Sequence, residues 1–547
     1  MSKKADKTKI SVPAQILGLP PLYWLTKETA PLIHSEDWFL VPLFVWFMTA
    51  ALTLEFTGTL CKFTPRILRQ RNAKRPQGHK GTASWATLSE VRRASNRKRG
   101  FFAGAIGNFA AFFEIETSGM VLAPAGGAKT IGFVIPALLN NPMSMLVTDL
   151  KGSLACVTAR HRRKKLGHRT YFLNPGGLFT NTLGPTTRFN PLHVLIKDWA
   201  NPERHKFLMT DVRGLAKQLL PEPPNAGENT FFRDGSRALL EFTMAYLVTS
   251  YGKVTLSEML SLLRDVERLE GALHTGRFSD ALSGDLASSA ADILGKLGDG
   301  DRRQFESFRE GALQVLRPFS PSGVLAAATE ESDFDFAEMK TGKVTVYLIC
   351  DPTQQEVFES WIGLVSKGAI TELIRSESRN PVLLLLDEAT NFKIESLPKL
   401  LTSVREFGIR VFVVLQELEQ WAHVYGRESL ETLLSQTELK IIHGSRSQKT
   451  CELVSKMLGN RSVRAESFNT GKHIFDQVTR SVSEIGVPLK TPEQISQMKE
   501  AIVFYKNLPP ILVDKVGYHE ISPWRRWADA NPYFGQKRFR GKVRLRL

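Results

Sequence analysis

The stretch Val121-Leu122-Ala123-Pro124-Ala125-Gly126-Gly127-Ala128-Lys129-Thr130 joins a short apolar strand to a helix-compatible run through a turn of small residues. This layout is typical of a phosphate-binding loop, in which backbone N–H groups and the start of a helix face the phosphates. In such a loop the lysine reaches the β- and γ-phosphates, and the hydroxyl reaches Mg²⁺. We therefore predict that nucleotide is bound by Ala123, Pro124, Ala125, Gly126, Gly127, Ala128, Lys129 and Thr130, with Thr130 also a metal ligand.

The fit to this motif is imperfect, because Ala123 and Ala128 stand where the motif has glycine. Taken alone, the stretch is also compatible with an ordinary strand, turn and helix that carry an exposed lysine. A Cβ at Ala128 is expected to crowd the phosphates or restrict the turn, since Gly reaches backbone conformations that are costly for Ala. The sequence thus predicts nucleotide binding that is weakened but not abolished.

Length and charge indicate a protein of two or three domains with a polyanionic partner. The chain has 547 residues and a formal net charge of +17. Such a balance favours nucleic acid or an anionic membrane surface as partner, although a soluble protein with a basic surface is the simpler alternative. The cysteines lie far apart in the sequence and form no C-x-x-C pair, which favours reduced thiols over disulfides or a zinc site: Cys61, Cys156, Cys350 and Cys451.

Residues 1–80 read as a membrane anchor followed by a basic linker. The segment Trp38–Leu54 is apolar and uncharged for about 17 residues, at the short end of the membrane-spanning range. Residues 62–99 are strongly basic, with Glu90 as the one acidic residue, which predicts that this side is cytoplasmic. We expect one span with the N-terminus outside. A buried core helix or an interfacial segment is the alternative.

From residue 81 onward, apolar strands alternate with helices, which predicts an α/β domain with a parallel sheet and ligands at the carboxyl ends of its strands. The expected strands fall in two parts of the chain, 81–199 and 336–520: Met120–Ala123, Met143–Thr148, Tyr171–Leu173, Val344–Ile349, Val382–Leu386, Arg410–Leu415, Leu439–Ile442 and Ala501–Tyr505.

Residues 200–335 lack a convincing strand and instead show apolar residues at helical spacing. We predict an all-α domain inserted into the α/β domain, and a basic tail over residues 521–547. The expected helices of the insert are Leu208–Leu220, Asp234–Thr249, Ser257–Ala272, Leu286–Leu297 and Arg302–Leu316.

Polar residues follow two of the predicted strands at the edge where the phosphate loop lies. Asp387 and Glu388 come directly after the aliphatic strand Val382–Leu386, in the form of a Walker B element. There Asp387 can hold Mg²⁺ and Glu388 can polarise the attacking water. Gln416 ends the next strand and can sense the γ-phosphate or help to place that water. Solvated strand ends are the alternative for each residue.

Taken together, these residues resemble the type IV coupling proteins, the TraG/TraD-like ATPases of conjugation and type IV secretion. The resemblance spans roughly residues 81–520, and its motifs occur in the family's order. They are Gly81-Thr82-Ala83-Ser84-Trp85-Ala86, Asp149-Leu150-Lys151-Gly152 with Thr158-Ala159-Arg160, Phe189-Asn190-Pro191-Leu192, Leu386-Asp387-Glu388-Ala389, Arg405-Glu406-Phe407-Gly408 with Gln416, Tyr425-Gly426 and Pro509-Pro510.

The resemblance implies a RecA-like P-loop NTPase domain that binds ATP and Mg²⁺, with the all-α insert facing the cytoplasm. It further implies a ring, expected to be a homo-hexamer, anchored in the bacterial inner membrane. Such a ring brings a relaxase–DNA complex or a protein substrate to a type IV secretion channel and drives or licenses its transfer. Arg405 would be either an arginine finger acting across a subunit interface or one side of a simple salt bridge.

Two departures from the family pattern leave a second hypothesis open. Ala128 replaces the glycine before the loop lysine, and one predicted span replaces the usual two. The first hypothesis is a DNA-stimulated coupling ATPase, favoured by Lys129, Thr130, Asp387, Glu388 and Gln416. The second is a non-hydrolysing, DNA-binding adaptor of the secretion machinery with a degenerate loop.

Overall fold

The computed structural model describes residues 80–223, 230–298, 302–469, 479–534 and 543–547. The chain divides into two units, one of residues 1–80 and 462–485 and the other of residues 81–461 and 486–547. In the smaller unit the Lys80 backbone N–H donates to Ser462 Oγ at 2.9 Å. Ser462 belongs to a two-stranded sheet of β10 (Asn460–Asn469) and β11 (Thr479–Pro488). The phosphate loop and the Walker B element lie in the larger unit.

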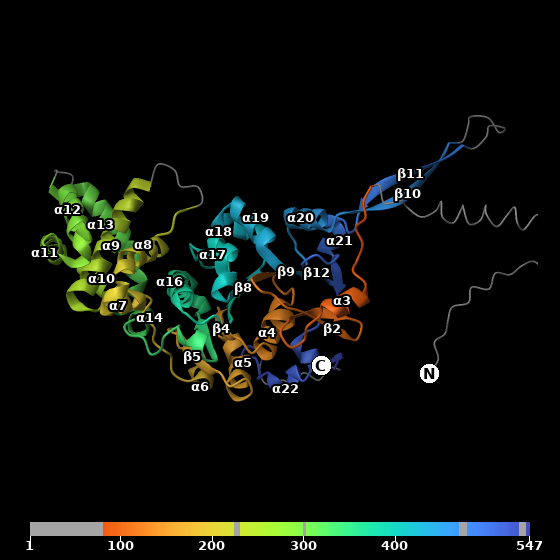
Figure 1. The fold of residues 1–547 in the computed structure, drawn as a ribbon, viewed down its shortest axis with the longest axis horizontal. Coiled ribbons are helices and arrows are strands. Elements are labelled where there is room, and N and C mark those ends of the chain that lie inside the picture. Colours follow the sequence, from red (N-terminus) through yellow and green to blue (C-terminus); the bar gives the residue numbers. More distant parts are fainter. Residues whose placement is uncertain (1–79, 224–229, 299–301, 470–478, 535–542) are drawn as a thin grey trace, which may run out of the picture. The chain divides into compact units, whose positions relative to one another are not determined.

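A nine-stranded sheet forms the centre of the larger unit (Figure 1). Seven neighbouring strands are parallel; at one edge the eighth strand runs antiparallel to them, and the ninth runs antiparallel to the eighth. In spatial order they are β13 (Ile511–Val513), β12 (Ala501–Tyr505), β9 (Thr437–Ile442), β3 (Ser118–Leu122), β8 (Ile409–Leu415), β7 (Val382–Leu386), β4 (Ser144–Asp149), β6 (Val344–Ile349) and β5 (Arg169–Leu173).

Both faces of this sheet are buried, which is why its strands read as continuous apolar runs. In β7, Val382, Leu384 and Leu386 belong to one hydrophobic cluster, whereas Leu383 and Leu385 belong to the other. Successive side chains of a strand point to opposite faces, so each central strand contributes to two cores.

Helices cover the first face, and a mixture of helices and one hairpin covers the second. On the first face lie α16 (Gln355–Arg375), α17 (Leu397–Ser403), α18 (Leu418–Tyr425), α19 (Arg427–Gln436), α20 (Gln448–Leu458) and α21 (Pro492–Ser496). On the second lie α4 (Ile135–Asn140), α5 (Ser153–Lys164), α22 (Trp524–Trp527) and the hairpin of β1 (Phe101–Ile106) and β2 (Phe109–Phe113).

All eight predicted strands are present in this one sheet, which confirms the α/β class. The expectation of a purely parallel sheet is wrong at one edge, where β12 runs antiparallel to β9. β12 and the edge strand β13 lie outside the seven parallel strands, so their direction leaves the parallel pairing undisturbed, and antiparallel strands at the edge of an otherwise parallel sheet are common. The β1–β2 hairpin and β13 were not predicted.

Between β5 and β6 the described residues form helices and the turns that connect them, with no strand. The five predicted helices of the insert are present, although Ser257–Ala272 is two helices. The break falls at Asp265, whose side chain accepts the Arg268 N–H and caps the second helix. The main helices are α7 (His193–Ala200), α8 (His205–Leu219), α9 (Thr230–Tyr251), α10 (Leu256–Arg264), α11 (Val266–Gly276), α12 (Asp285–Gly298) and α13 (Arg302–Leu316).

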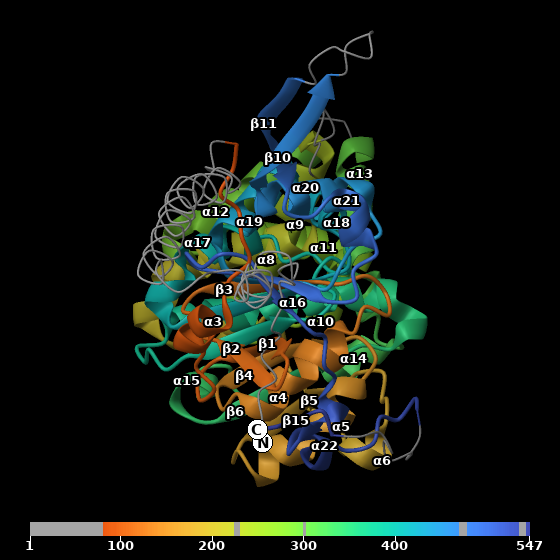
Figure 2. The same cartoon turned by 90° about the vertical axis from the view of Figure 1, so that its right-hand side faces the viewer.

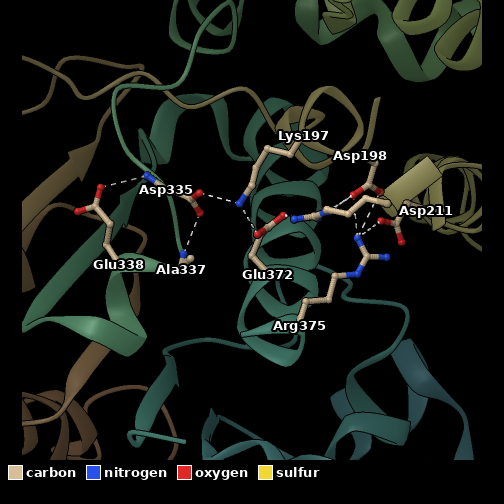
Figure 3. A network of polar contacts seen from close by, with 9 residues as sticks. Lys197, Asp198, Asp211, Asp335, Ala337, Glu338, Glu372 and Arg375 are labelled. Atoms are coloured by element: carbon tan, nitrogen blue, oxygen red, sulfur yellow. Dashed lines mark hydrogen bonds and ion pairs between the residues drawn. The ribbon is translucent and has the colours of Figure 1, made fainter. Parts of the chain in front are cut away.

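A partly buried network of ion pairs joins this insert to the α/β domain (Figure 3). Lys197 of α7 lies 2.6 Å from carboxylate oxygens of both Asp335 and Glu372. Arg375, at the end of α16, contacts Asp198 of α7 at 3.3 Å and Asp211 of α8 at 2.6 Å. Asp198 is fully buried, and Arg375 together with Arg204, which lies 2.6 Å from it, supplies the opposite charge and the hydrogen bonds that such a carboxylate needs.

The membrane-span prediction lies outside the described residues, since it falls at 38–54. Among the helices that the structure does describe, none combines the length and apolar character needed to cross a bilayer.

Described residues of the segment predicted as a basic tail take part in the core of the α/β domain. Both views place α22 beside α5 (Figure 1 and Figure 2). The indole of Trp524 is fully buried and meets Phe102 and Phe112 edge-on, at 5.2 and 6.1 Å between ring centroids. Residues 521–522 pair in parallel with residues 545–546, which returns the end of the chain to this domain.

Replacing Trp524 by Ala is therefore expected to destabilise the α/β domain by about 3–5 kcal/mol, the usual cost of emptying a large aromatic site. The measurement is the free energy of unfolding in chemical denaturant. Phe534→Ala is the control, because Phe534 is 81% exposed and its loss should cost less than about 0.5 kcal/mol. Equal effects of the two changes would contradict the packing of this segment.

Candidate nucleotide site

The predicted phosphate loop joins β3 to a helix at the carboxyl edge of the sheet. The Ala123 N–H donates to the Leu415 carbonyl at 3.0 Å, which extends the β3–β8 pairing by one residue. The Gly127 N–H donates to the Pro124 carbonyl at 2.8 Å and closes the turn. One π-helical turn, η3 (Thr130–Val134), then leads into α4. The strand, turn and helix of the sequence prediction are all present.

Ala128 adopts a left-handed backbone conformation, with φ at +66°. A residue with a Cβ reaches this region at a cost of roughly 1–2 kcal/mol, whereas glycine reaches it freely. The loop thus keeps a backbone shape suited to glycine although alanine occupies the position. The replacement of the motif's glycine by alanine, which the sequence shows at position 128, therefore places a Cβ on a left-handed backbone.

The ammonium group of Lys129 faces the two acids that follow β7. Its Nζ lies 3.3 Å from Glu388 Oε1 and 3.9 Å from Asp387 Oδ1. The Lys129 side chain is 10% exposed, so its charge lies in a poorly solvated place and is balanced by both carboxylates. The sheet therefore brings together the loop lysine and the Walker B acids, which are 258 and 259 residues apart in the chain.

Asp387 carries the most perturbed carboxyl group of the site. Burial raises its pKa to about 7, against the opposing effect of the Lys129 charge, and the nearby acids Glu388 and Asp149 raise it further. Its Oδ1 is buried and accepts no hydrogen bond from the described residues. A buried carboxylate oxygen without a donor, beside a phosphate loop that begins its helix with Thr130, fits a hard cation such as Mg²⁺.

Glu388 is held in place from two sides. Its backbone is left-handed, with φ at +54°. One carboxylate oxygen faces Lys129, and the other accepts a hydrogen bond from Asn391 Nδ2 at 3.1 Å. The Asn391 N–H also donates to the Glu388 carbonyl at 2.9 Å. These contacts fix the orientation of the Glu388 carboxylate.

Gln416 lies at this same edge, and Arg405 lies at the opposite one. Gln416 directly follows Leu415, whose carbonyl accepts the Ala123 N–H, and its side chain is half-buried. Arg405 precedes β8, in the short helix η8 (Val404–Phe407), and forms an exposed ion pair with Glu116. Within one chain, Arg405 therefore does not belong to the group around Lys129.

Sequence reasoning assigned no role to two residues that shape the site, Asn391 and His443. His443 follows β9, and its Nδ1 lies 2.9 Å from the carbonyl oxygen of Gly127 in the phosphate loop. Its position after a strand of the sheet was a signal that could have pointed to it. Asn391 follows no strand, and nothing in its sequence surroundings marks it.

Asp149, also at a strand end, accepts the Ala155 N–H at 2.8 Å and stabilises the start of α5.

Fold and site together define an α/β protein with a phosphate-binding loop and a Walker B strand, and the chain belongs to the type IV secretory system family for conjugative DNA transfer. The family's sequence profile matches residues 75–538. This confirms the resemblance to the coupling proteins noted from the motifs.

Named relatives agree with this assignment. The chain is 26% identical over 517 residues to VirD4 of Rhizobium rhizogenes, covering 89% of this chain and 73% of VirD4. It is 24% identical over 420 residues to the conjugal transfer protein TraG of Escherichia coli, covering 71% of this chain and 63% of TraG.

Solved structures of the conjugative coupling protein TrwB share the fold. The unbound form matches with a TM-score of 0.59 and 18% identity, over 80% of this chain and 96% of TrwB. The form in complex with ADP and Mg²⁺ matches with a TM-score of 0.57 and 19% identity, over 79% and 93% of the two chains.

Without nucleotide and metal, Asp387→Asn is expected to stabilise the protein increasingly as the pH rises. An Asp pKa near 7 in the folded state and near 4 when unfolded means that the folded parent holds its proton to higher pH. The parent therefore loses stability between about pH 4 and 7, and a neutral amide does not. The gain over the parent should approach about 4 kcal/mol at pH 8 and be small at pH 4.5.

The measurement is the free energy of unfolding of both proteins across this pH range. Asp529→Asn is the matched control, because Asp529 forms a partly exposed ion pair with Arg160 at 2.7 Å. Its replacement should change stability by less than about 1 kcal/mol at either pH. A pH-independent difference between the parent and Asp387→Asn would contradict the buried, proton-binding carboxyl group.

Proposed function

We propose that this chain is a coupling ATPase that recruits a relaxase–DNA complex or a protein substrate to a type IV secretion channel and drives or licenses its transfer. The observation that carries this proposal is the meeting of Lys129 with Asp387 and Glu388 at the carboxyl edge of the sheet. Family membership supplies the context of conjugative DNA transfer. That TrwB was solved with ADP and Mg²⁺, and with a non-hydrolysable ATP analogue, supports ATP and Mg²⁺ as the ligands.

Each residue of the site has a role that follows from its place. Bound ATP with Mg²⁺ supplies the phosphoryl group and the metal charge. The backbone N–H groups of residues 123–130 would bind the phosphates. The ammonium group of Lys129, which pairs with Asp387 and Glu388 in this structure, would then contact the phosphates. Thr130 and Asp387 would hold the metal. Glu388, oriented by Asn391, would accept the proton of a water molecule, and Gln416 would help to place that water.

The geometry at Ala128 favours the motor over the adaptor. A degenerate loop that had lost its shape would support a non-hydrolysing protein, but the left-handed backbone at this position is kept. We propose accordingly that Ala128 weakens nucleotide binding without abolishing it.

We further propose that the working form is a membrane-anchored homo-hexamer in the bacterial inner membrane, with residues 1–80 as anchor and linker. In such a ring Arg405, which is 70% exposed and far from its own chain's phosphate loop, would face a neighbouring subunit. The net charge of +17 suits a DNA partner that is bound through its phosphates without sequence preference.

Hydrolysis is tested by comparing Glu388→Gln and Lys129→Ala with the parent. Glu388→Gln keeps the shape and removes the charge that polarises water, so nucleotide should still bind while DNA-stimulated turnover falls by about 10²–10⁴-fold. Lys129→Ala should lose both binding and turnover. The measurements are ATP affinity and phosphate release with and without DNA. Full turnover by Glu388→Gln would remove Glu388 from the chemistry, and a parent that binds without turnover would support the adaptor.

The anchor is tested by membrane fractionation. The full chain should sediment with membranes and resist carbonate extraction, because an apolar helix across the bilayer is held by the hydrophobic effect rather than by charge. The same chain with two Lys residues placed in 38–54 should be released. Release of the parent by carbonate would show that it is a peripheral protein.

A further inference from the structure

We infer that His443 is a positioning residue of the nucleotide site, whose ring holds the Gly127 carbonyl and thereby fixes the left-handed backbone of Ala128. This inference rests on the proposed function, because it concerns the loop that would face the phosphates. His443 lies at the end of β9, more than 300 residues from the loop in sequence.

The contact between His443 and the loop is buried and built on the sheet. The His443 N–H donates to the Leu122 carbonyl at 2.8 Å, which continues the pairing of β9 with β3 by one residue. From this fixed backbone the imidazole contacts the loop, with Nδ1 2.9 Å from Gly127 O. The residue is 4% exposed, so water competes little for this hydrogen bond.

The direction of the hydrogen bond follows from its acceptor. A carbonyl oxygen has no proton to give, so Nδ1 must carry the hydrogen. Burial lowers the pKa of His443 to about 4, and the nearby Lys515 lowers it further, against the opposing effect of the Gly127 bond. At neutral pH the ring is therefore uncharged and protonated on Nδ1 alone.

This bond acts on the one backbone angle that alanine finds costly. The Gly127 carbonyl and the Ala128 N–H belong to the same planar peptide unit, so the direction of that carbonyl sets the φ of Ala128. On the other side of Ala128, its own carbonyl accepts the Gly132 N–H at 2.8 Å. Both peptide planes that flank Ala128 are thus held, and φ stays at +66°.

The helix after the loop leaves room for the ring. A Cβ placed on Gly132 would lie 3.4 Å from His443 Cε1, so a larger side chain at this position would press on the imidazole. The ring is held between the loop and the first turn of the helix that begins at Thr130. Lys129 follows Ala128 directly, so the same restraint sets the direction from which the lysine leaves the loop.

The test compares two variants of similar size that differ in the hydrogen-bond donor. In His443→Asn the side-chain amide can take the place of Nδ1, whereas His443→Leu offers no donor. ATP affinity of the full chain, measured by equilibrium titration with Mg²⁺ present, should fall about tenfold in His443→Leu and less than about threefold in His443→Asn. Both variants lose the ring, so loss of packing alone would affect them alike.

The link to Ala128 is tested by combining each variant with Ala128→Gly. Glycine reaches the left-handed region without help, so His443→Leu should cost less than about threefold in ATP affinity in that background. A ligand-free measurement runs beside it: hydrogen exchange of the amides of residues 126–130 should speed up in His443→Leu and stay near the parent's rate in His443→Asn and in His443→Leu with Ala128→Gly.

The outcomes separate this inference from the proposed function. A parent that binds no ATP removes the proposed function, while hydrogen exchange in the free protein still tests His443. A parent that binds ATP, loses it with Lys129→Ala and is unchanged by His443→Leu overturns the inference alone. Equal effects of His443→Leu with and without Ala128→Gly also overturn it. If His443→Leu does not fold, His443→Met serves as the donor-free variant, with the same expected results.

Discussion

The parallel pairing of β3 with β8 on one side and β9 on the other is the constraint on which the site depends. It brings the phosphate loop, Gln416 and His443 to one edge of the sheet, because parallel strands end together. The next strand, β7, adds Asp387 and Glu388 at that edge. Strands buried on both faces cannot slip in register without moving large side chains, so the positions of these polar groups are fixed by the two apolar cores.

The site holds its charges in a place where burial disfavours them. The pKa of Asp387 is raised to about 7 and that of Asp149 to about 6, in both cases mainly through burial. Lys129 offsets part of this cost with its ammonium group. The strained backbones of Ala128 and Glu388 lie within the same small region. Carboxyl groups with shifted pKa values and non-glycine residues with left-handed backbones are frequent at functional sites, where contacts with the surrounding structure hold them in place.

The all-α insert is tied directly to the loop that follows Glu388. Gln218, near the end of α8, donates to the Lys393 carbonyl at 2.7 Å and accepts the Glu395 N–H at 3.0 Å. Lys393 Nζ in turn donates to the Glu222 carbonyl at 2.5 Å. With the ion pairs around Arg375, this gives the insert two separate attachments to the α/β domain. One of them lies a few residues from the acid that would polarise water.

The sequence by itself determined the order of strands and helices and placed the candidate site residues at strand ends. Hydrophobic periodicity and strand-end polar residues are local signals, so the strand Val382–Leu386 and the acids after it could be located without a fold. Only the tertiary structure decided which strands are neighbours and that β12 is antiparallel. It also decided that Asn391 and His443 meet the site and that Gln218 holds the loop after Glu388. These contacts join residues far apart in the chain or on loops, and their partners are selected by packing and hydrogen-bond geometry, which no local pattern records. Ala128 shows both sides: its identity was visible in the sequence, but its left-handed backbone and the imidazole that holds it exist only in the folded chain.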